Sequence, residues 1–161
     1  MNIAFKRAIL QDAEMIQKGQ IRCFGGYLNK YHDDEANPCN ESLESIRNSI
    51  MNQFFYKILA DDKFAGAIYV HENPDAQHFK LHTVFILPEY QGLGLCQKAI
   101  DYIEEQHSEA FEWELETPHD LTRNHHVYEK KGYRRTGIEF KVNDNMTLIH
   151  YRKSINGGEK E

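Results

Sequence analysis

The stretch from Val84 to Gln97 constrains the fold of this chain more than any other. Its apolar run from Val84 to Leu87 predicts a strand that is buried on both faces. Pro88 ends this strand, and Gly92 and Gly94 then allow a left-handed or tightly turned backbone that brings successive N–H groups to the start of a helix. Because those donors add to the positive end of the helix dipole, we expect the junction to bind a phosphate.

Length and composition predict one globular domain. The chain has 161 residues, of which 40% are hydrophobic and 27% are charged, and we expect a domain over residues 1–156 followed by a disordered tail, 157–161. No apolar run approaches the roughly 20 residues of a membrane helix, and the first residues lack the apolar core of a signal peptide. We therefore expect a cytoplasmic protein with no membrane partner.

The distribution of charge favours a cationic partner. A formal net charge of −6 argues against nucleic acid, which requires clustered Lys and Arg. Acidic residues gather at Asp33, Asp34 and Glu35, where their field would attract an amine. A solvated acidic loop is the alternative interpretation of the same residues.

Cysteines and histidines predict no metal site. The 3 cysteines lack Cys-x-x-Cys spacing, so they indicate neither a disulfide framework nor a zinc site. His119, His125 and His126 lie close in sequence, but adjacent helical side chains diverge by about 100°, and no carboxylate has ligand spacing beside them. We expect these histidines to be solvated and the protein to hold no metal.

The spacing of apolar residues predicts strands and helices that alternate along the chain. In the second predicted helix, Leu43, Ile46, Ile50 and Met51 are expected on the inner side. The order of elements predicts one α+β domain with a mixed sheet. In the first half of the chain, the predicted elements are a strand at 3–8, a helix capped by Asp12 and stopped by Gly25 and Gly26, a helix at 42–52, and strands at 54–60, 64–71 and 79–87. A helix at 94–107 follows, and then a strand in which Phe111, Trp113 and Leu115 alternate with glutamates. The last predicted elements are a short helix capped by Thr122 or Asp120 and ended by Gly132, and strands at 133–142 and 146–154.

The chain resembles the GNAT superfamily of acetyl-CoA-dependent N-acetyltransferases over nearly its whole length, and two motifs in the expected order carry the resemblance. The sequence Gln91-Gly92-Leu93-Gly94-Leu95-Cys96, after the strand end at Pro88, is similar to the family's Gln/Arg-x-x-Gly-x-Gly/Ala pyrophosphate loop. The sequence Tyr128-Glu129-Lys130-Lys131-Gly132-Tyr133 is similar to its Tyr-Glu-Lys-x-Gly-Tyr/Phe signature. A strand before the loop, a helix after it and a second motif make the combination specific.

The resemblance implies a GNAT fold, with a central sheet of about seven strands, helices on both faces and a splay at the acetyl-CoA site. Backbone groups of Val84, Phe85 and Ile86 would pair with the pantetheine arm like an added strand. Pyrophosphate would bind the turn formed by Gln91, Gly92, Leu93, Gly94, Leu95, Cys96 and Gln97.

This chain departs from the family pattern at two positions. Cys96 stands where the loop usually ends in Gly or Ala, and Leu121 stands where many members have an asparagine that holds the cofactor. Asn124 is the predicted substitute for that asparagine.

The resemblance also implies direct attack of an amine on the thioester of acetyl-CoA. Glu116 is the first choice as the base that takes the amine proton, and His82 competes with it because a histidine pKa near 6.5 suits proton transfer at neutral pH. Tyr128 would protonate or hydrogen-bond the leaving thiolate, and the backbone N–H of Ile86 would polarise the thioester carbonyl.

The acceptor is expected to be a primary amine, either a small molecule, an amino-acid derivative, a polyamine or a protein amine. Residues 23–40 would form its site, with Tyr27, Tyr31 and the acidic residues 33–35 as contacts. The alternatives are a GNAT that uses another acyl-CoA donor and a non-catalytic CoA-binding sensor. Analogy with the superfamily alone suggests a homodimer. Four basic residues are candidates for contacts with the phosphates at the adenosine end of CoA, and the alternative is that they are ordinary charged residues of the surface: Lys130, Lys131, Arg134 and Arg135.

Overall fold

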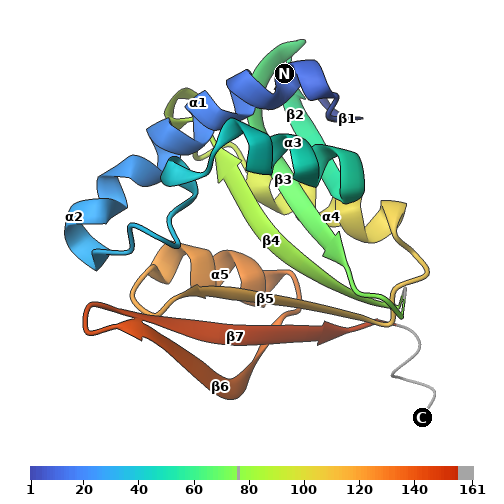
Figure 1. Ribbon diagram of the computed structural model, residues 1–161. Helices are drawn as coiled ribbons and strands as arrows, with labels where there is room; N and C mark the ends of the chain where they lie inside the picture. Colours follow the sequence, from blue (N-terminus) through green and yellow to red (C-terminus); the bar gives the residue numbers. More distant parts are fainter. Residues whose placement is uncertain (76, 156–161) are drawn as a thin grey trace.

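The protein is described by a computed structural model that covers residues 1–75 and 77–155 (Figure 1). The predicted tail, 157–161, and the predicted domain boundary at 156 lie outside the described residues. None of the helices in the two described ranges combines the length and the apolar character that a bilayer crossing requires.

One sheet of seven strands runs through the molecule in the order β1-β2-β3-β4-β5-β7-β6. Neighbouring strands pair in antiparallel fashion except β4 and β5, which are parallel. The predicted α+β domain with a mixed sheet of seven strands is therefore confirmed. The strands are β1 (Ile3–Arg7), β2 (Phe54–Ala60), β3 (Lys63–Glu72), β4 (His78–Ile86), β5 (Glu112–Pro118), β6 (Arg134–Asn143) and β7 (Met146–Ser154).

Helices cover both faces of the sheet (Figure 1). One core lies under α1 and α3, where Ile16 and Ile46 pack against Phe55 and Phe85. The other core lies under α4, whose apolar side chains pack against Ile68, Phe79 and Trp113 of the sheet. The helices are α1 (Ala13–Phe24), α2 (Leu28–Tyr31), α3 (Leu43–Asn52), α4 (Leu95–Gln106) and α5 (Thr122–Lys130).

Several local predictions for the helices are wrong. α1 ends at Phe24 with Gly25 as its C-cap residue, as predicted, but a 3₁₀ turn (Gly25–Tyr27) then leads into α2, a helix that the sequence did not predict. Met51 is 65% exposed, since it lies about 100° around the helix from buried Ile50. The Asp12 carboxylate accepts from the backbone N–H of Ile9 at 2.8 Å and makes no cap bond to α1.

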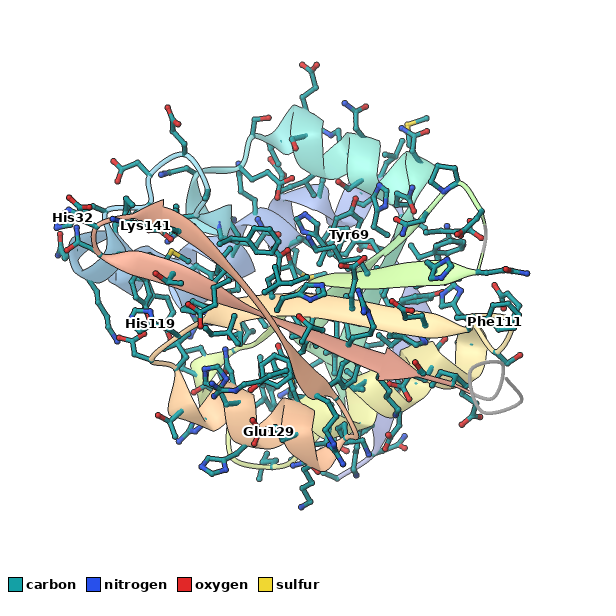
Figure 2. All side chains as sticks on the ribbon, turned by 90° about the horizontal axis from the view of Figure 1, so that it is seen from below. His32, Tyr69, Phe111, His119, Glu129 and Lys141 are labelled. Atoms are coloured by element: carbon teal, nitrogen blue, oxygen red, sulfur yellow. The ribbon has the colours of Figure 1, made fainter. Side chains whose placement is uncertain are left out.

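The remaining corrections concern the start of β5 and of α5. Phe111 precedes β5 and lies at the edge of the molecule (Figure 2). It is 43% exposed, so the inward alternation starts only at Trp113. The N-cap residue of α5 is Leu121, and neither Asp120 nor Thr122 caps that helix with its side chain.

β4 and β5 separate after a short contact. Their parallel pairing is limited to residues 78–80 of β4 opposite 112–114 of β5. Beyond this point the two strands diverge, and the edge of β4 that faces β5 is left without a strand partner (Figure 1). This observation confirms the predicted splay.

A β-bulge at His82 reverses the alternation of side chains between the two faces of β4. Tyr69 of β3 pairs with Thr83 and Val70 pairs with Leu81, so His82 is an extra residue in β4. Before the bulge, Leu81 packs in the core under α4, whereas after it Phe85 packs in the core under α1. The extra residue therefore lets one strand serve both cores.

β3 and β4 approach so closely that only glycine fits at position 66. A Cβ atom on Gly66 would lie 2.2 Å from the carbonyl oxygen of Phe85, which is backbone and cannot rotate away. Gly66 therefore allows β3 to pack closely against β4 at the point where the opposite edge of β4, toward β5, has no strand partner.

We expect Gly66→Ala to lower the free energy of unfolding by about 1 to 3 kcal/mol, because the added methyl forces β4 away from β3. Urea denaturation would measure this loss. Gly25→Ala is the matched control, since a Cβ there meets nothing within 4 Å and the φ of −58° suits alanine. Equal stability of the two variants would contradict the close approach.

Candidate functional site

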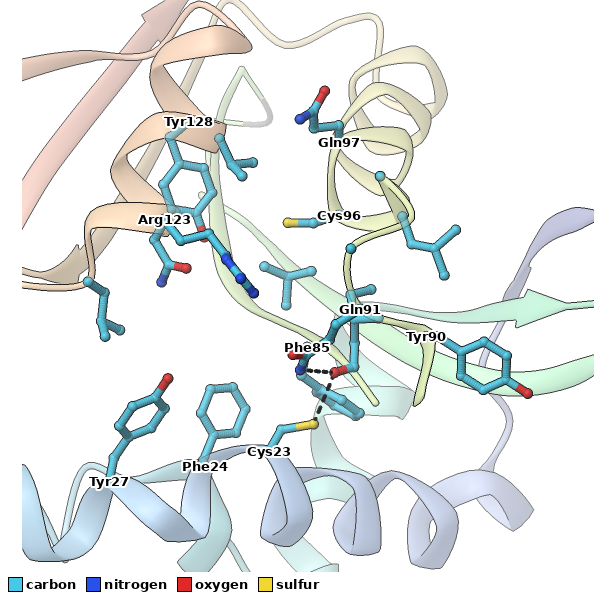
Figure 3. A pocket seen from close by; sticks show the side chains of 18 residues that line it. Cys23, Phe24, Tyr27, Phe85, Tyr90, Gln91, Cys96, Gln97, Arg123 and Tyr128 are labelled. Atoms are coloured by element: carbon cyan, nitrogen blue, oxygen red, sulfur yellow. Dashed lines mark hydrogen bonds between the residues drawn. The ribbon is translucent and has the colours of Figure 1, made fainter. Parts of the chain in front are cut away.

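Two cavities open where β4 leaves β5. The first, of about 470 Å³, is the glycine-loop cavity, and it lies between α1, the end of β4 and the first turns of α4 and α5 (Figure 3). The second, of about 250 Å³, is the β5 cavity, and it lies between β4, β5, the β6–β7 hairpin and the segment that follows α1. The cavities meet at a junction lined by the residues common to both: Phe24, Tyr27, Val84, Leu121, Asn124 and Tyr128.

The glycine loop presents free amide groups to the first cavity. Gly92 and Gly94 have φ of 80° and 78°, and Gly94 is the N-cap residue of α4. The first helical bond of α4 runs from Lys98 N–H to Gly94 O, so the N–H groups of residues 95–97 have no acceptor within the helix. Together with the helix dipole, they form a site for an anion.

Most of the residues predicted for this turn line the glycine-loop cavity. Leu93 is the exception, because it is 48% exposed and lines neither cavity. The side-chain Nε2 of Gln91 donates to the Ile86 carbonyl at 2.9 Å and so braces the loop against the strand end (Figure 3). Those that line the cavity are Gln91, Gly92, Gly94, Leu95, Cys96 and Gln97.

The unpaired edge of β4 forms one wall of the cavity through Val84, Phe85 and Ile86. The Leu87 N–H donates a hydrogen bond of 2.8 Å to the carbonyl oxygen of Ala65 in the neighbouring strand, β3. Because successive N–H groups of a strand point in opposite directions, the N–H groups of Ile86 and Val84 face the splay. An extended ligand would find backbone groups available there.

Tyr128 places its hydroxyl at the junction of the two cavities (Figure 3). The side chain is 6% exposed, and burial, with a smaller effect from Cys96, raises the pKa of its phenol well above the usual 10.0. The hydroxyl therefore keeps its proton at neutral pH and is a hydrogen-bond donor. Asn124, one turn earlier, is held by a 3.1 Å hydrogen bond from its Nδ2 to Thr117 Oγ1.

Arg123 is a cavity residue that the sequence interpretation missed. It is the single charged side chain among the described residues that line the glycine-loop cavity, and Figure 3 shows it reaching into that space. Arg123 directly precedes Asn124, the predicted substitute for the asparagine that holds the cofactor, and this position in the sequence could have identified it as a cavity residue. Both side chains start from the first turn of α5, beside the junction.

Both candidate bases lie in the β5 cavity. Oε1 of Glu116 is 3.3 Å from Nζ of Lys80 on the opposite side of the splay. His82 sits at the bulge, where lost hydration and the charge of Lys80 lower the pKa of its imidazole below 6.5. The ring is therefore neutral near pH 7 and has a lone pair to accept a proton.

The other two glutamates on this face of β5 line neither cavity. They are not merely solvated, because Glu112 is paired with Arg152 at 2.6 Å and Glu114 with His150 at 2.8 Å. Glu116 is therefore distinguished by its position rather than by a lack of partners.

A family comparison identifies the chain. The acetyltransferase (GNAT) family model matches residues 14–133, which include the glycine loop and Tyr128. The chain belongs to the GNAT family of acetyltransferases. Comparison with curated protein sequences finds no match.

Solved GNAT structures share the fold at low sequence identity. The PaiA N-acetyltransferase of Thermoplasma acidophilum, crystallised with coenzyme A, has a TM-score of 0.80 at 16% identity and covers 96% of this chain and 100% of its own. A spermidine N-acetyltransferase SpeG chimera from Vibrio cholerae and hSSAT has a TM-score of 0.76 at 14% identity, covering 96% of both chains. A putative acetyltransferase of Desulfovibrio desulfuricans has a TM-score of 0.73 at 19% identity and covers 95% of this chain and 99% of its own.

The segment after α1 covers the β5 cavity of this GNAT domain. Of the residues predicted to contact the acceptor, Tyr27, Tyr31 and Asp33 line this cavity, whereas Asp34 and Glu35 are exposed and line neither cavity. Asn143 fastens the segment to the β6–β7 hairpin by donating to the carbonyl oxygens of Tyr31 and His32 at 2.9 and 3.0 Å, and His32 lies beside that hairpin in Figure 2.

The four basic residues considered for the adenosine end of CoA line neither cavity. Lys131 pairs with Asp101 at 2.5 Å, and Arg135 with Glu129 at 3.6 Å. Arg134 donates to nearby backbone carbonyls, and Lys130 is exposed.

His125 is buried, which contradicts the prediction that the three histidines are solvated. It is 6% exposed, its Nδ1 lies 2.6 Å from the Tyr151 hydroxyl, and its Nε2 lies 3.1 Å from the carbonyl oxygens of Pro118 and His119. These contacts join the start of α5 to the end of β5 and to β7. Within residues 1–75 and 77–155, no group of three His, Cys, Asp or Glu side chains is placed to hold a metal ion.

We expect Arg123→Gln to weaken coenzyme A binding about tenfold, because a hydrogen bond to a charged partner contributes about 1.5 to 3 kcal/mol. Isothermal titration calorimetry would measure the change, and the difference from wild type should shrink as salt is raised. Arg134→Gln is the matched control, since Arg134 lines neither cavity. An equal loss in both variants would contradict a local role for Arg123.

Proposed function

We propose that this GNAT protein transfers the acetyl group of acetyl-CoA to a primary amine by direct attack. The observation that carries the proposal is the junction at Tyr128, where a cavity with an anion site meets a second cavity that contains two candidate bases. A donor and an acceptor bound in separate cavities would bring their reacting ends together there.

The donor would occupy the glycine-loop cavity. Its diphosphate would bind the free amides of residues 95–97 and the guanidinium of Arg123. Its pantetheine arm would pair with the backbone of Val84 and Ile86 along the open edge of β4, as an added strand does. The PaiA protein, whose structure contains coenzyme A, supports this placement through its shared fold.

The acceptor would occupy the β5 cavity and lose a proton before or during attack. An alkyl ammonium has no lone pair, and with a pKa near 10.4 most of the amine is charged at neutral pH. We assign Glu116 as the base, because it lines the cavity from the end of the splayed strand. Lys80, which pairs with Glu116 in the structure, would keep the carboxylate in position.

The junction also contains donors for the charges that develop during transfer. As the amine nitrogen forms its bond to the thioester carbon, negative charge grows on the carbonyl oxygen, and the N–H of Ile86 on the open strand edge would stabilise it. When the C–S bond breaks, the Tyr128 hydroxyl would donate its proton or a hydrogen bond to the sulfur. The raised pKa of Tyr128 suits this role because the phenol remains protonated.

The decisive experiment measures thiol release from acetyl-CoA across classes of primary amine. We expect Tyr128→Phe to lower kcat about 10²-fold, in the range of general acid catalysis, while coenzyme A binding measured by calorimetry changes little. Tyr102→Phe is the control, since Tyr102 lies on α4 and lines neither cavity.

The same screen tests the alternatives. Release with a longer acyl-CoA but not with acetyl-CoA would show a different donor. Binding of coenzyme A without turnover of any amine, together with a Tyr128→Phe variant that behaves as wild type, would replace the enzyme by a CoA-binding sensor.

A second set of variants identifies the base. Glu116→Gln should lower kcat/KM about 10²-fold, because the amide cannot accept the amine proton, whereas Glu114→Gln on the same strand face should change it little. His82→Asn tests the competing residue. If His82→Asn abolishes the acidic limb of the pH–rate profile and Glu116→Gln does not, the imidazole is the base.

A further inference from the structure

We propose that the acceptor carries a second positive charge and that Asp33 binds it, so that the preferred substrate is a diamine or polyamine rather than a monoamine. This inference rests on the proposed acetyl transfer and specifies the substrate class of the same site. It starts from a buried carboxylate in the wall of the β5 cavity.

Asp33 is buried without a compensating positive charge. Its side chain is 6% exposed, and within residues 1–75 and 77–155 the hydrogen bonds to its two carboxylate oxygens are long ones, of 3.3 and 3.4 Å, from the neutral amide of Asn37. Among the described residues, the nearest lysine in sequence, Lys30, is paired with Asp120, and the lysine of the cavity, Lys80, is paired with Glu116. A buried carboxylate is costly unless a cation accompanies it, and a bound ligand would supply that cation.

The charges of the β5 cavity sum to a negative site at Asp33. Lys80 and Glu116 offset each other across the splay. His82 is neutral near pH 7, because lost hydration lowers its pKa. The carboxylate of Asp33 is then the charge left over in the cavity wall, and it favours a cationic ligand.

Asp33 does not belong to the place where the amine reacts. It lines the β5 cavity from the segment that follows α1, whereas Glu116 lies beside Thr117, whose Oγ1 accepts a hydrogen bond from the junction residue Asn124. The reacting nitrogen must reach the junction at Tyr128 and must be uncharged when it attacks. The charge that Asp33 complements therefore belongs to another group of the same acceptor.

The wall between the junction and Asp33 suits a slender chain with a cationic end. Tyr27 lines both cavities and Tyr31 lines only the β5 cavity, and their ring centroids lie 5.6 Å apart. Aromatic faces bind methylene groups and also attract ammonium groups. Val142 and Leu148 add apolar surface from the β6–β7 hairpin.

The test compares acceptors that differ only in the second amine. Steady-state kinetics would be measured with 1,4-diaminobutane and butylamine at fixed acetyl-CoA. We expect wild-type kcat/KM to be at least tenfold higher for 1,4-diaminobutane than for butylamine. Asp33→Asn should raise KM for 1,4-diaminobutane at least tenfold more than KM for butylamine.

Two matched variants separate recognition of charge from a structural effect. Asp34→Asn removes the adjacent exposed carboxylate and should retain the diamine preference. Asp33→Glu keeps the charge and should retain much of the preference. If Asp33→Asn does not fold, the wild-type comparison of 1,4-diaminobutane with butylamine decides the outcome. Thermal unfolding and coenzyme A binding would be measured for every variant.

The outcomes separate this inference from the proposed function. Turnover of butylamine and 1,4-diaminobutane with equal kcat/KM, or an equal effect of Asp33→Asn on both, would overturn the role of Asp33 and leave acetyl transfer standing. Absence of turnover with every amine, when coenzyme A still binds, would overturn the proposed function itself.

Discussion

The splay between β4 and β5 is the constraint on which the rest of the structure depends. Backbone N–H and C=O groups at the middle of a sheet are normally paired, because unpaired polar groups away from water are costly. Here the pairing stops after residues 78–80, and the edge of β4 beyond this point faces a cavity instead of a strand. A fold that leaves central backbone groups open in this way is suited to a ligand that completes the sheet.

Two features of β4 make this arrangement stable. The extra residue His82 reverses the alternation of side chains, so that Phe85 packs under α1 while Leu81 packs under α4. Gly66 lets β3 approach β4 more closely than any side chain would permit. The strand is thus held firmly on one edge and on both faces, and only the edge toward β5 is open.

The two cavities differ in electrostatic character. The glycine-loop cavity presents amide N–H groups and Arg123, which favour phosphate, whereas the β5 cavity contains the buried carboxylate of Asp33. Between them, Tyr128 is held protonated by burial. An anionic donor and a cationic acceptor would therefore be directed to opposite sides of one neutral junction.

The resemblance to a known family singled out Tyr128, whereas the order of the strands, four of the five helices and the glycine turn at the start of α4 followed from the amino-acid sequence itself, because periodicity, Pro and Gly act over a few residues. Their local physics needs no distant partner. The sequence also predicted a splayed seven-stranded sheet, although only through that resemblance.

Tertiary structure alone decided the features that depend on residues far apart in the chain. Asp33 is buried whereas its neighbour Asp34 is exposed. His125 is buried against Pro118 and Tyr151, and the side chain of Arg123 lines the glycine-loop cavity. Neighbours of the same residue type have the same local propensity, so only the packing of the surrounding elements distinguishes them. The bulge at His82 has the same origin, because a bulge is a relation between two strands and no single segment encodes it.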